Sequence, residues 1–124
     1  MLIDHIGVAI SDYERSKEFY LKALAPLNIG LVVEIQGWAG FGGNGKTDFW
    51  FGPDDTVQSP MHIAFVAESR EKVEQFYTAA IAAGARDNGK PGVRPEYHRN
   101  YYGAFVIDPD GHNIEAVCHQ EENV

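Results

Sequence analysis

Two histidines and one glutamate stand where they could hold a metal ion. His5 and His62 occupy matching positions of an internal repeat, and Glu115 lies in an apolar run near the C-terminus. Two imidazoles and one carboxylate leave positions open on a divalent ion, an arrangement that suits Fe(II), Mn(II) and similar ions. Such an ion would bind two adjacent oxygens of a substrate, one of them anionic, and would stabilise negative charge that develops there.

The repeat covers a strand and a helix in each half of the chain. Residues 4–24 read DHIGVAISDYERSKEFYLKAL, residues 61–81 read MHIAFVAESREKVEQFYTAAI, and the two segments align without a gap. His5 aligns with His62 in this repeat. A duplicated unit with a histidine at the same strand position would place two imidazoles near a pseudo-twofold axis, which favours the metal interpretation.

Each repeat begins with an apolar strand, predicted over Leu2–Ile10 and Met61–Val66, and continues as an amphipathic helix. Alternation puts each histidine on one face of its strand. Ser11 and Glu14 have the spacing of a capping box, and Ser69 is the expected N-cap of the second helix.

Further strand segments follow each helix and are separated by glycine-rich turns. They are Leu31–Ile35, Trp38–Phe41 and Asp48–Phe51 in the first half, and Ala85–Asp87, Tyr102–Ile107 and Asn113–Cys118 in the second. The stretch Asn88–Asn100 is expected to be a loop over one end of the sheet. We therefore predict an α+β fold in a single domain over residues 1–124. Two β-α-β-β-β modules, about residues 1–52 and 60–119, would form one curved, incompletely closed mixed sheet.

The bulk composition excludes several classes of partner. The net charge of -8 argues against nucleic acid, because binding to phosphate relies on clustered Lys and Arg. No apolar run approaches the roughly 20 residues that a membrane span needs. With a single cysteine and no basic N-terminal region, we expect a cytoplasmic protein.

A dense group of polar and aromatic residues lies just before a predicted strand. A loop here could close over the site, with His98 or Tyr101 as an acid–base group beside Glu115 and with Arg94 or Arg99 binding an anionic substrate. The candidate substrate-binding residues are Trp38, Trp50, Arg94, Tyr97, Arg99 and Tyr102. The alternative is structural: the tyrosines would pack against the sheet rim, the charges would be solvated and the tryptophans would belong to the core.

Two other residues are not expected to take part in the chemistry. Cys118 alternates away from Glu115 along its strand and is predicted to be a small core residue. His112 lies in a turn and is expected to face solvent.

The chain resembles the vicinal oxygen chelate superfamily, which contains glyoxalase I, bleomycin-resistance proteins, fosfomycin-resistance thiol transferases and extradiol dioxygenases. The resemblance rests on the β-α-β-β-β duplication, the histidine that begins each half, SKEFY at residues 16–20 and DPDGHNIEAV at residues 108–117. It implies that the metal ligands are His5, His62 and Glu115.

One ligand of this family pattern is missing. Glyoxalase I has a fourth ligand, a Glu on the last strand of the first half, where this chain has Trp50 as the internal counterpart of Glu115. Since Trp cannot bind a metal, glyoxalase I activity is in doubt, and Asp48 could substitute only if the strand shifted.

The resemblance implies a metal-dependent glyoxalase-like enzyme that chelates vicinal oxygens of a small anionic substrate with Fe, Mn, Ni or Zn. Lyase or isomerase, thiol transferase and dioxygenase reactions remain open. The alternative is a metal-free binding protein of the bleomycin-resistance type, with an aromatic ligand held by Trp38, Trp50 and the tyrosines. Modules of this superfamily often pair between chains, so the resemblance also implies a homodimer, in which the site could draw ligands from both subunits. Whether the modules pair within or between chains stays open.

Overall fold

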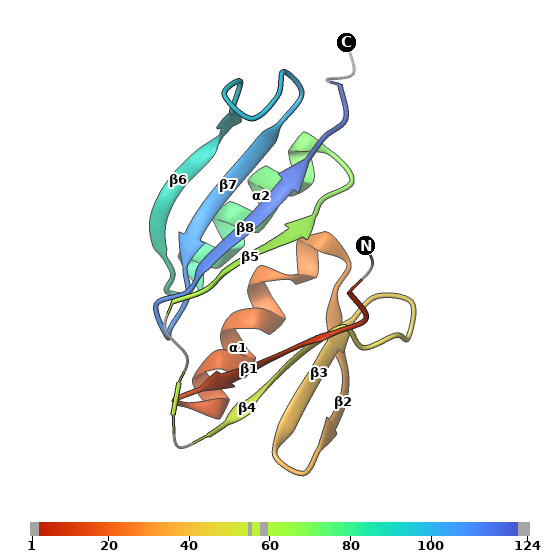
Figure 1. The fold of residues 1–124 in the computed structure, drawn as a ribbon, viewed down its shortest axis with the longest axis vertical. Coiled ribbons are helices and arrows are strands. Elements are labelled where there is room, and N and C mark those ends of the chain that lie inside the picture. The colour runs from red at the N-terminus through yellow and green to blue at the C-terminus, as the bar shows by residue number, and fades with distance from the viewer. Residues whose placement is uncertain (1–2, 55, 58–59, 122–124) are drawn as a thin grey trace.

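A computed structural model describes residues 3–54, 56, 57 and 60–121, and Figure 1 shows their arrangement. The elements are β1 Ile6–Ile10, α1 Tyr13–Ala23, the 3-10 helix η1 Ala25–Leu27, β2 Gly30–Ile35, β3 Trp38–Gly42, β4 Phe49–Pro53, β5 His62–Val66, α2 Arg70–Ala82, β6 Arg86–Val93, β7 Tyr102–Ile107 and β8 Asn113–Cys118. Leu2, part of the first predicted strand, lies outside the described residues. No helix in the described ranges is long and apolar enough to cross a membrane.

The two β-α-β-β-β modules and the α+β class are confirmed. The strands form two four-stranded sheets, ordered β1-β4-β3-β2 and β5-β8-β7-β6, in place of the one continuous sheet that was expected. In each sheet the first strand pairs in parallel with the last strand of its module, and the other pairs are antiparallel.

One face of each sheet packs into the core, and the other carries the predicted site residues. Val8, Phe51, Ile114 and other apolar side chains lie in one buried cluster with residues of both helices. Side chains alternate along a strand, so the neighbours of these residues point to the opposite face. His5, Trp50, His62 and Glu115 belong to that second face.

The structure corrects the prediction of a loop at Asn88–Asn100, since β6 continues to Val93. Its glycines and proline suggested a loop. Yet the strand keeps its pairing with β7 by shifting register between Asp87 and Gly89 and again between Gly89 and Gly92. These irregularities admit the residues that a regular strand disfavours.

One of the two predicted helix N-caps is confirmed, and the other is wrong. Ser69 accepts a hydrogen bond from the backbone N–H of Lys72, which confirms it as the N-cap of α2. The N-cap of α1 is Asp12 and not Ser11. Ser11 instead donates from its hydroxyl to Asp110 in the second module over 2.6 Å.

A buried carboxylate joins the two modules. Asp108 accepts a 2.5 Å hydrogen bond from the Tyr20 hydroxyl of α1 through Oδ2, and backbone N–H groups of Asp110 and His112 through Oδ1. The expectation that His112 faces solvent is wrong, because its side chain is fully buried and its Nδ1 accepts from the Met61 N–H over 2.9 Å. The turn before β8 thus folds inward.

Tyr20→Phe should lower the free energy of unfolding by about 1–3 kcal/mol, since it removes the only described donor to Oδ2 of buried Asp108. Urea unfolding of the variant and the wild type measures this difference. Tyr13→Phe is the matched control, because the Tyr13 hydroxyl donates to an exposed Glu34, and its cost should be about 0.5 kcal/mol or less. Equal losses in the two variants would contradict the structural importance of the Tyr20–Asp108 bond.

Candidate metal centre

The second module holds a fully buried carboxylate between two polar side chains. Glu115 lies in the middle of β8, directly opposite Ala64 of β5 and Phe105 of β7. Its Oε1 lies 2.7 Å from Nε2 of His62, and its Oε2 accepts a hydrogen bond from the hydroxyl of Tyr101. The carboxylate is inaccessible to solvent, whereas 53% of the His62 side chain is exposed.

A glycine makes room for this arrangement. A Cβ at Gly103 would lie 3.1 Å from Oε2 of Glu115 and 3.2 Å from the Tyr101 ring. Gly103 is the second residue of β7, and sequence reasoning missed this glycine as a signal of the close approach.

The charge of Glu115 lacks a permanent cation beside it. Within the part of the chain that the structure describes, the only ion-pair partner of Glu115 is His62, and no Lys or Arg lies within ion-pair distance. A buried carboxylate without a cation is costly, so this site favours a positive charge supplied from outside the chain.

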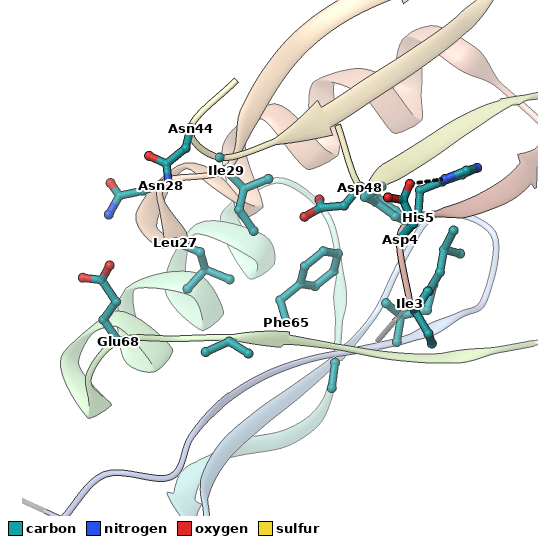
Figure 2. Close-up of a pocket in the computed structure, with 16 residues that line it drawn as sticks. Ile3, Asp4, His5, Leu27, Asn28, Ile29, Asn44, Asp48, Phe65 and Glu68 are labelled. Carbon is teal, nitrogen blue, oxygen red and sulfur yellow. Dashed lines mark hydrogen bonds and ion pairs between the residues drawn. The ribbon is translucent and has the colours of Figure 1, made fainter. Parts of the chain in front are cut away.

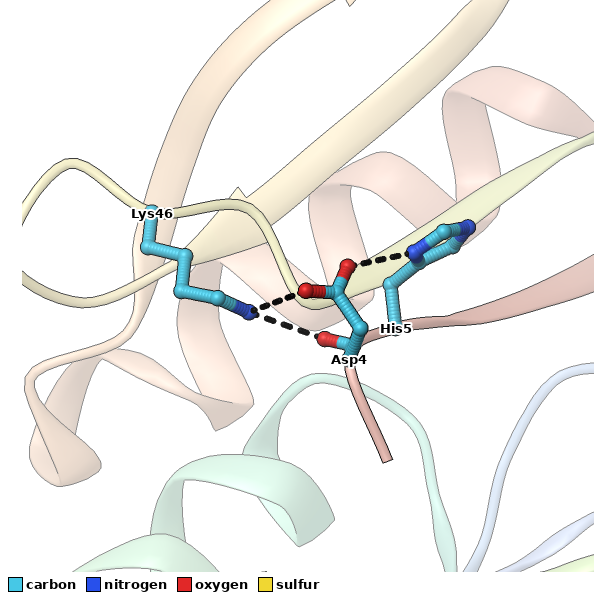
Figure 3. Close-up of polar contacts among 3 residues, drawn as sticks. All are labelled: Asp4, His5 and Lys46. Carbon is cyan, nitrogen blue, oxygen red and sulfur yellow. Dashed lines mark hydrogen bonds and ion pairs between the residues drawn. The ribbon is translucent and has the colours of Figure 1, made fainter. Parts of the chain in front are cut away.

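His5, the third predicted ligand, lies at the start of the first module in a different setting. Figure 3 shows Asp4 between His5 and Lys46. Asp4 Oδ1 lies 2.7 Å from His5 Nδ1, and Lys46 Nζ donates to the Asp4 carbonyl over 2.9 Å. The hydrogen bond to His5, and then the charge of Lys46, lower the pKa of Asp4, so its carboxylate accepts and Nδ1 of His5 carries the proton. The Nε2 lone pair of this exposed imidazole is therefore left for a ligand role.

The structure brings His62 and Glu115 together but does not bring His5 to them. Among the residues that it describes, no three His, Cys, Asp or Glu side chains stand close enough to hold a metal ion. His5 instead lines a hollow of about 380 Å³ with Trp38 and Trp50. The expected three-ligand set is therefore divided between the two modules of a single chain.

The strand register places Trp50 at the internal equivalent of Glu115. Trp50 pairs with Gly7 of β1, just as Glu115 pairs with Ala64 of β5. A Cβ on Gly40, the partner of Trp50 in β3, would lie 2.9 Å from the indole, so this glycine makes room for the ring. The first module thus has an aromatic ring where the second has a carboxylate.

Asp48 does not take the place of the missing ligand. It lines a separate cleft of about 730 Å³ together with Asp4, His5 and Glu68. Figure 2 shows Asp48 near Asp4 at one end of this cleft and Glu68 at the other. Asp48 is not among the residues that line the hollow beside Trp50.

The predicted acid–base residue His98 contacts Tyr101, and Tyr101 in turn bonds to Glu115. Its Nε2 lies 2.7 Å from Nδ1 of His119, and its ring contacts the edge of Tyr101 at 5.8 Å between centroids. Tyr97 also contacts the Tyr101 ring, at 4.9 Å between the ring centroids. These residues surround Tyr101, which alone among them reaches the carboxylate of Glu115.

Three other predicted binding residues fall in different places. Arg94 lies with its guanidinium over the ring of Phe105, 5.4 Å from the centroid, on the same face as Glu115. Arg99 is 86% exposed and lies 3.9 Å from Glu121. Tyr102 donates a 2.6 Å hydrogen bond to Glu74 of α2, so its hydroxyl is directed to the helix and not to the site.

Comparison with known proteins agrees with this fold. Residues 2–116 match the Glyoxalase/Bleomycin resistance protein/Dioxygenase superfamily. A glyoxalase/bleomycin resistance protein from Albidiferax ferrireducens T118 is similar over 93% of this chain and 97% of its own, at 30% identity and a TM-score of 0.81. The chain therefore belongs to this superfamily.

More distant structures show the same fold. A glyoxalase-related enzyme from Fulvimarina pelagi has 19% identity and a TM-score of 0.73, with 95% of this chain and 88% of that chain covered. A glyoxalase/bleomycin resistance protein/dioxygenase family enzyme from Burkholderia phytofirmans PsJN has 17% identity and a TM-score of 0.74, over 97% of this chain and 100% of its own.

The stability that depends on Tyr101 should decline in alkaline solution. Burial, followed by the bond to Glu115, holds the pKa of Tyr101 well above its usual value. The folded chain therefore retains this proton where the unfolded chain loses it, so the contribution is complete below about pH 10 and falls as pH rises through the folded pKa. Urea unfolding of wild type and Tyr101→Phe should show a difference that is steady between about pH 8 and about pH 9 and that shrinks from about pH 10 to about pH 12. A difference that stays constant over this range would contradict the assignment.

Proposed function

We propose that this protein is a metal-dependent glyoxalase-like enzyme that chelates adjacent oxygens of a small anionic substrate. The observation that carries the proposal is the fully buried carboxylate of Glu115, 2.7 Å from the nearest ring nitrogen of His62, with no Lys or Arg within ion-pair distance in the described ranges. Membership of the superfamily supports the same interpretation.

The donor set fits a divalent ion such as Fe, Mn, Ni or Zn. His62 and Glu115 already present a nitrogen and an oxygen to each other, and an ion between them would replace the proton that they share. The ion would also supply the positive charge that buried Glu115 lacks. Imidazole and carboxylate together suit the borderline and hard ions of this group.

His5 would complete the set from a second copy of the chain. Its Nδ1 is occupied by Asp4, its Nε2 is available, and it stands apart from the other two ligands within one chain. A homodimer that placed the first module of one subunit against the second module of the other would unite all three. We therefore propose a homodimeric enzyme.

When bound, the ion would polarise the substrate oxygens and stabilise negative charge on them. The side chains around the ion would orient its ligands. Tyr101 holds a proton at its hydroxyl and orients Glu115 through a hydrogen bond. His98 and Tyr97 pack around the Tyr101 ring and fix its position. This ligand set is compatible with lyase or isomerase, thiol-transfer and oxygenation reactions.

Elemental analysis of protein purified without a tag or chelator tests the proposal. The wild type should carry Fe, Mn, Ni or Zn at near one ion per chain, and His62→Ala and Glu115→Gln should lose it, since each removes a ligand. Glu18→Gln is the matched control for Glu115→Gln, because it changes an exposed carboxylate of α1 that pairs with Lys22 and lies away from the site. Wild-type protein that neither carries nor takes up these ions would overturn the proposal.

A second candidate is a metal-free binding protein of the bleomycin-resistance type. The favouring observation is the hollow lined by Trp38 and Trp50, whose rings lie against the sheet beside His5. This candidate requires that ligand-induced changes in tryptophan fluorescence persist unchanged in the presence of a chelator. The metal-dependent proposal requires that the chelator alters them.

A further inference from the structure

Arg94 is held in a fixed position on the sheet of the second module. Its Nη2 donates a 2.7 Å hydrogen bond to the carbonyl of Lys90, and the guanidinium lies over the Phe105 ring. Cβ atoms on Gly89 and Gly92 would lie 3.3 Å and 3.0 Å from its terminal nitrogens. The two glycines at the irregularities of β6 therefore make the space in which the guanidinium lies.

The charge of Arg94 is not paired with a carboxylate. Within residues 3–54, 56, 57 and 60–121, no Asp or Glu lies within ion-pair distance of it, although the chain has a net charge of -8. Arg99 differs, because it is exposed and lies beside Glu121. A half-buried guanidinium that is pre-positioned and unpaired has most of its five N–H groups available for an anion.

The guanidinium belongs to the surface that surrounds the candidate metal centre. Phe105, on which it stacks, lies directly opposite Glu115 in the sheet, and the Phe105 and His62 ring centroids are 6.0 Å apart. An anion bound to Arg94 would thus lie beside the residues proposed to hold the metal.

We propose that Arg94 is the specificity-determining residue for a substrate that carries a carboxylate, phosphonate or phosphate group. A guanidinium fork binds such oxyanions through two parallel hydrogen bonds, which fixes their orientation as well as their charge. The Phe105 ring beneath it excludes water from one side. That this anion is part of the substrate rests on the proposed function, whereas binding of the anion by Arg94 does not.

Fluorine NMR on chelator-treated, metal-free protein tests the assignment with two probes of equal shape, 4-fluorobenzoate and 4-fluorobenzamide. The wild type should bind the benzoate about tenfold more tightly than the uncharged amide, as expected for a hydrogen bond to a charged group. Arg94→Gln should reduce this preference to less than twofold. Arg94→Lys, which keeps the charge and loses the fork, should retain part of it.

Arg99→Gln is the matched control and should retain the full preference. The assignment is overturned if Arg94→Gln discriminates between the probes as the wild type does, or if Arg99→Gln loses the preference instead. Because the protein is metal-free here, the result is independent of the metal analysis. A preference that depends on Arg94 in a protein that binds no metal would leave an anion-binding protein in place of the proposed metalloenzyme.

Discussion

The buried carboxylate of Glu115 is the constraint on which the second module is built. It lies at the centre of β8 and is closed off from solvent, so its two oxygens must be satisfied by side chains from other elements. His62 from β5 satisfies one, and Tyr101, which lies just before β7, satisfies the other. The glycine at position 103 and the ring contacts around Tyr101 follow from this requirement.

The two copies of the module differ at the position of Glu115 in the candidate metal centre. Both copies keep a histidine near the start of the first strand and the same pairing of first and last strands. The last strand carries Trp50 in one copy and Glu115 in the other, and the aromatic copy needs Gly40 and Gly52 to accommodate its indoles. The first module therefore has an aromatic surface beside His5, and the second module has the paired His62 and Glu115.

Much of the fold could be predicted because burial on one face fixes the alternation of each strand. The gap-free repeat correctly predicted β5 and both helices, whereas β1 begins at Ile6 and so later than predicted. The equivalence of Trp50 and Glu115 followed from the family resemblance, and the strand register agrees with it. The length of β6 could not be predicted, because its bulges depend on pairing with β7. The role of Ser11 was also missed, since its partner Asp110 lies in the other module.

The site was only partly predictable for a related reason. Residue types and strand faces identified His62 and Glu115, because a carboxylate on an apolar strand must be paired or bound. Their separation from His5 depends on how the two sheets pack, which no local pattern encodes. The two arginines could not be told apart either, because both lie in the same polar and aromatic segment of the sequence. The fold places Arg94 over the Phe105 ring and Arg99 at the exposed surface.

Metal binding by a mixed dimer tests the central claim most directly. His5→Ala and Glu115→Ala chains, each with a different affinity tag, would be unfolded together, refolded and purified through both tags. If the site joins His5 of one subunit to His62 and Glu115 of the other, the mixed dimer regains one intact metal site, whereas each variant alone has none. A mixed dimer that stays metal-free, while wild type treated in the same way regains its metal, would contradict the shared site.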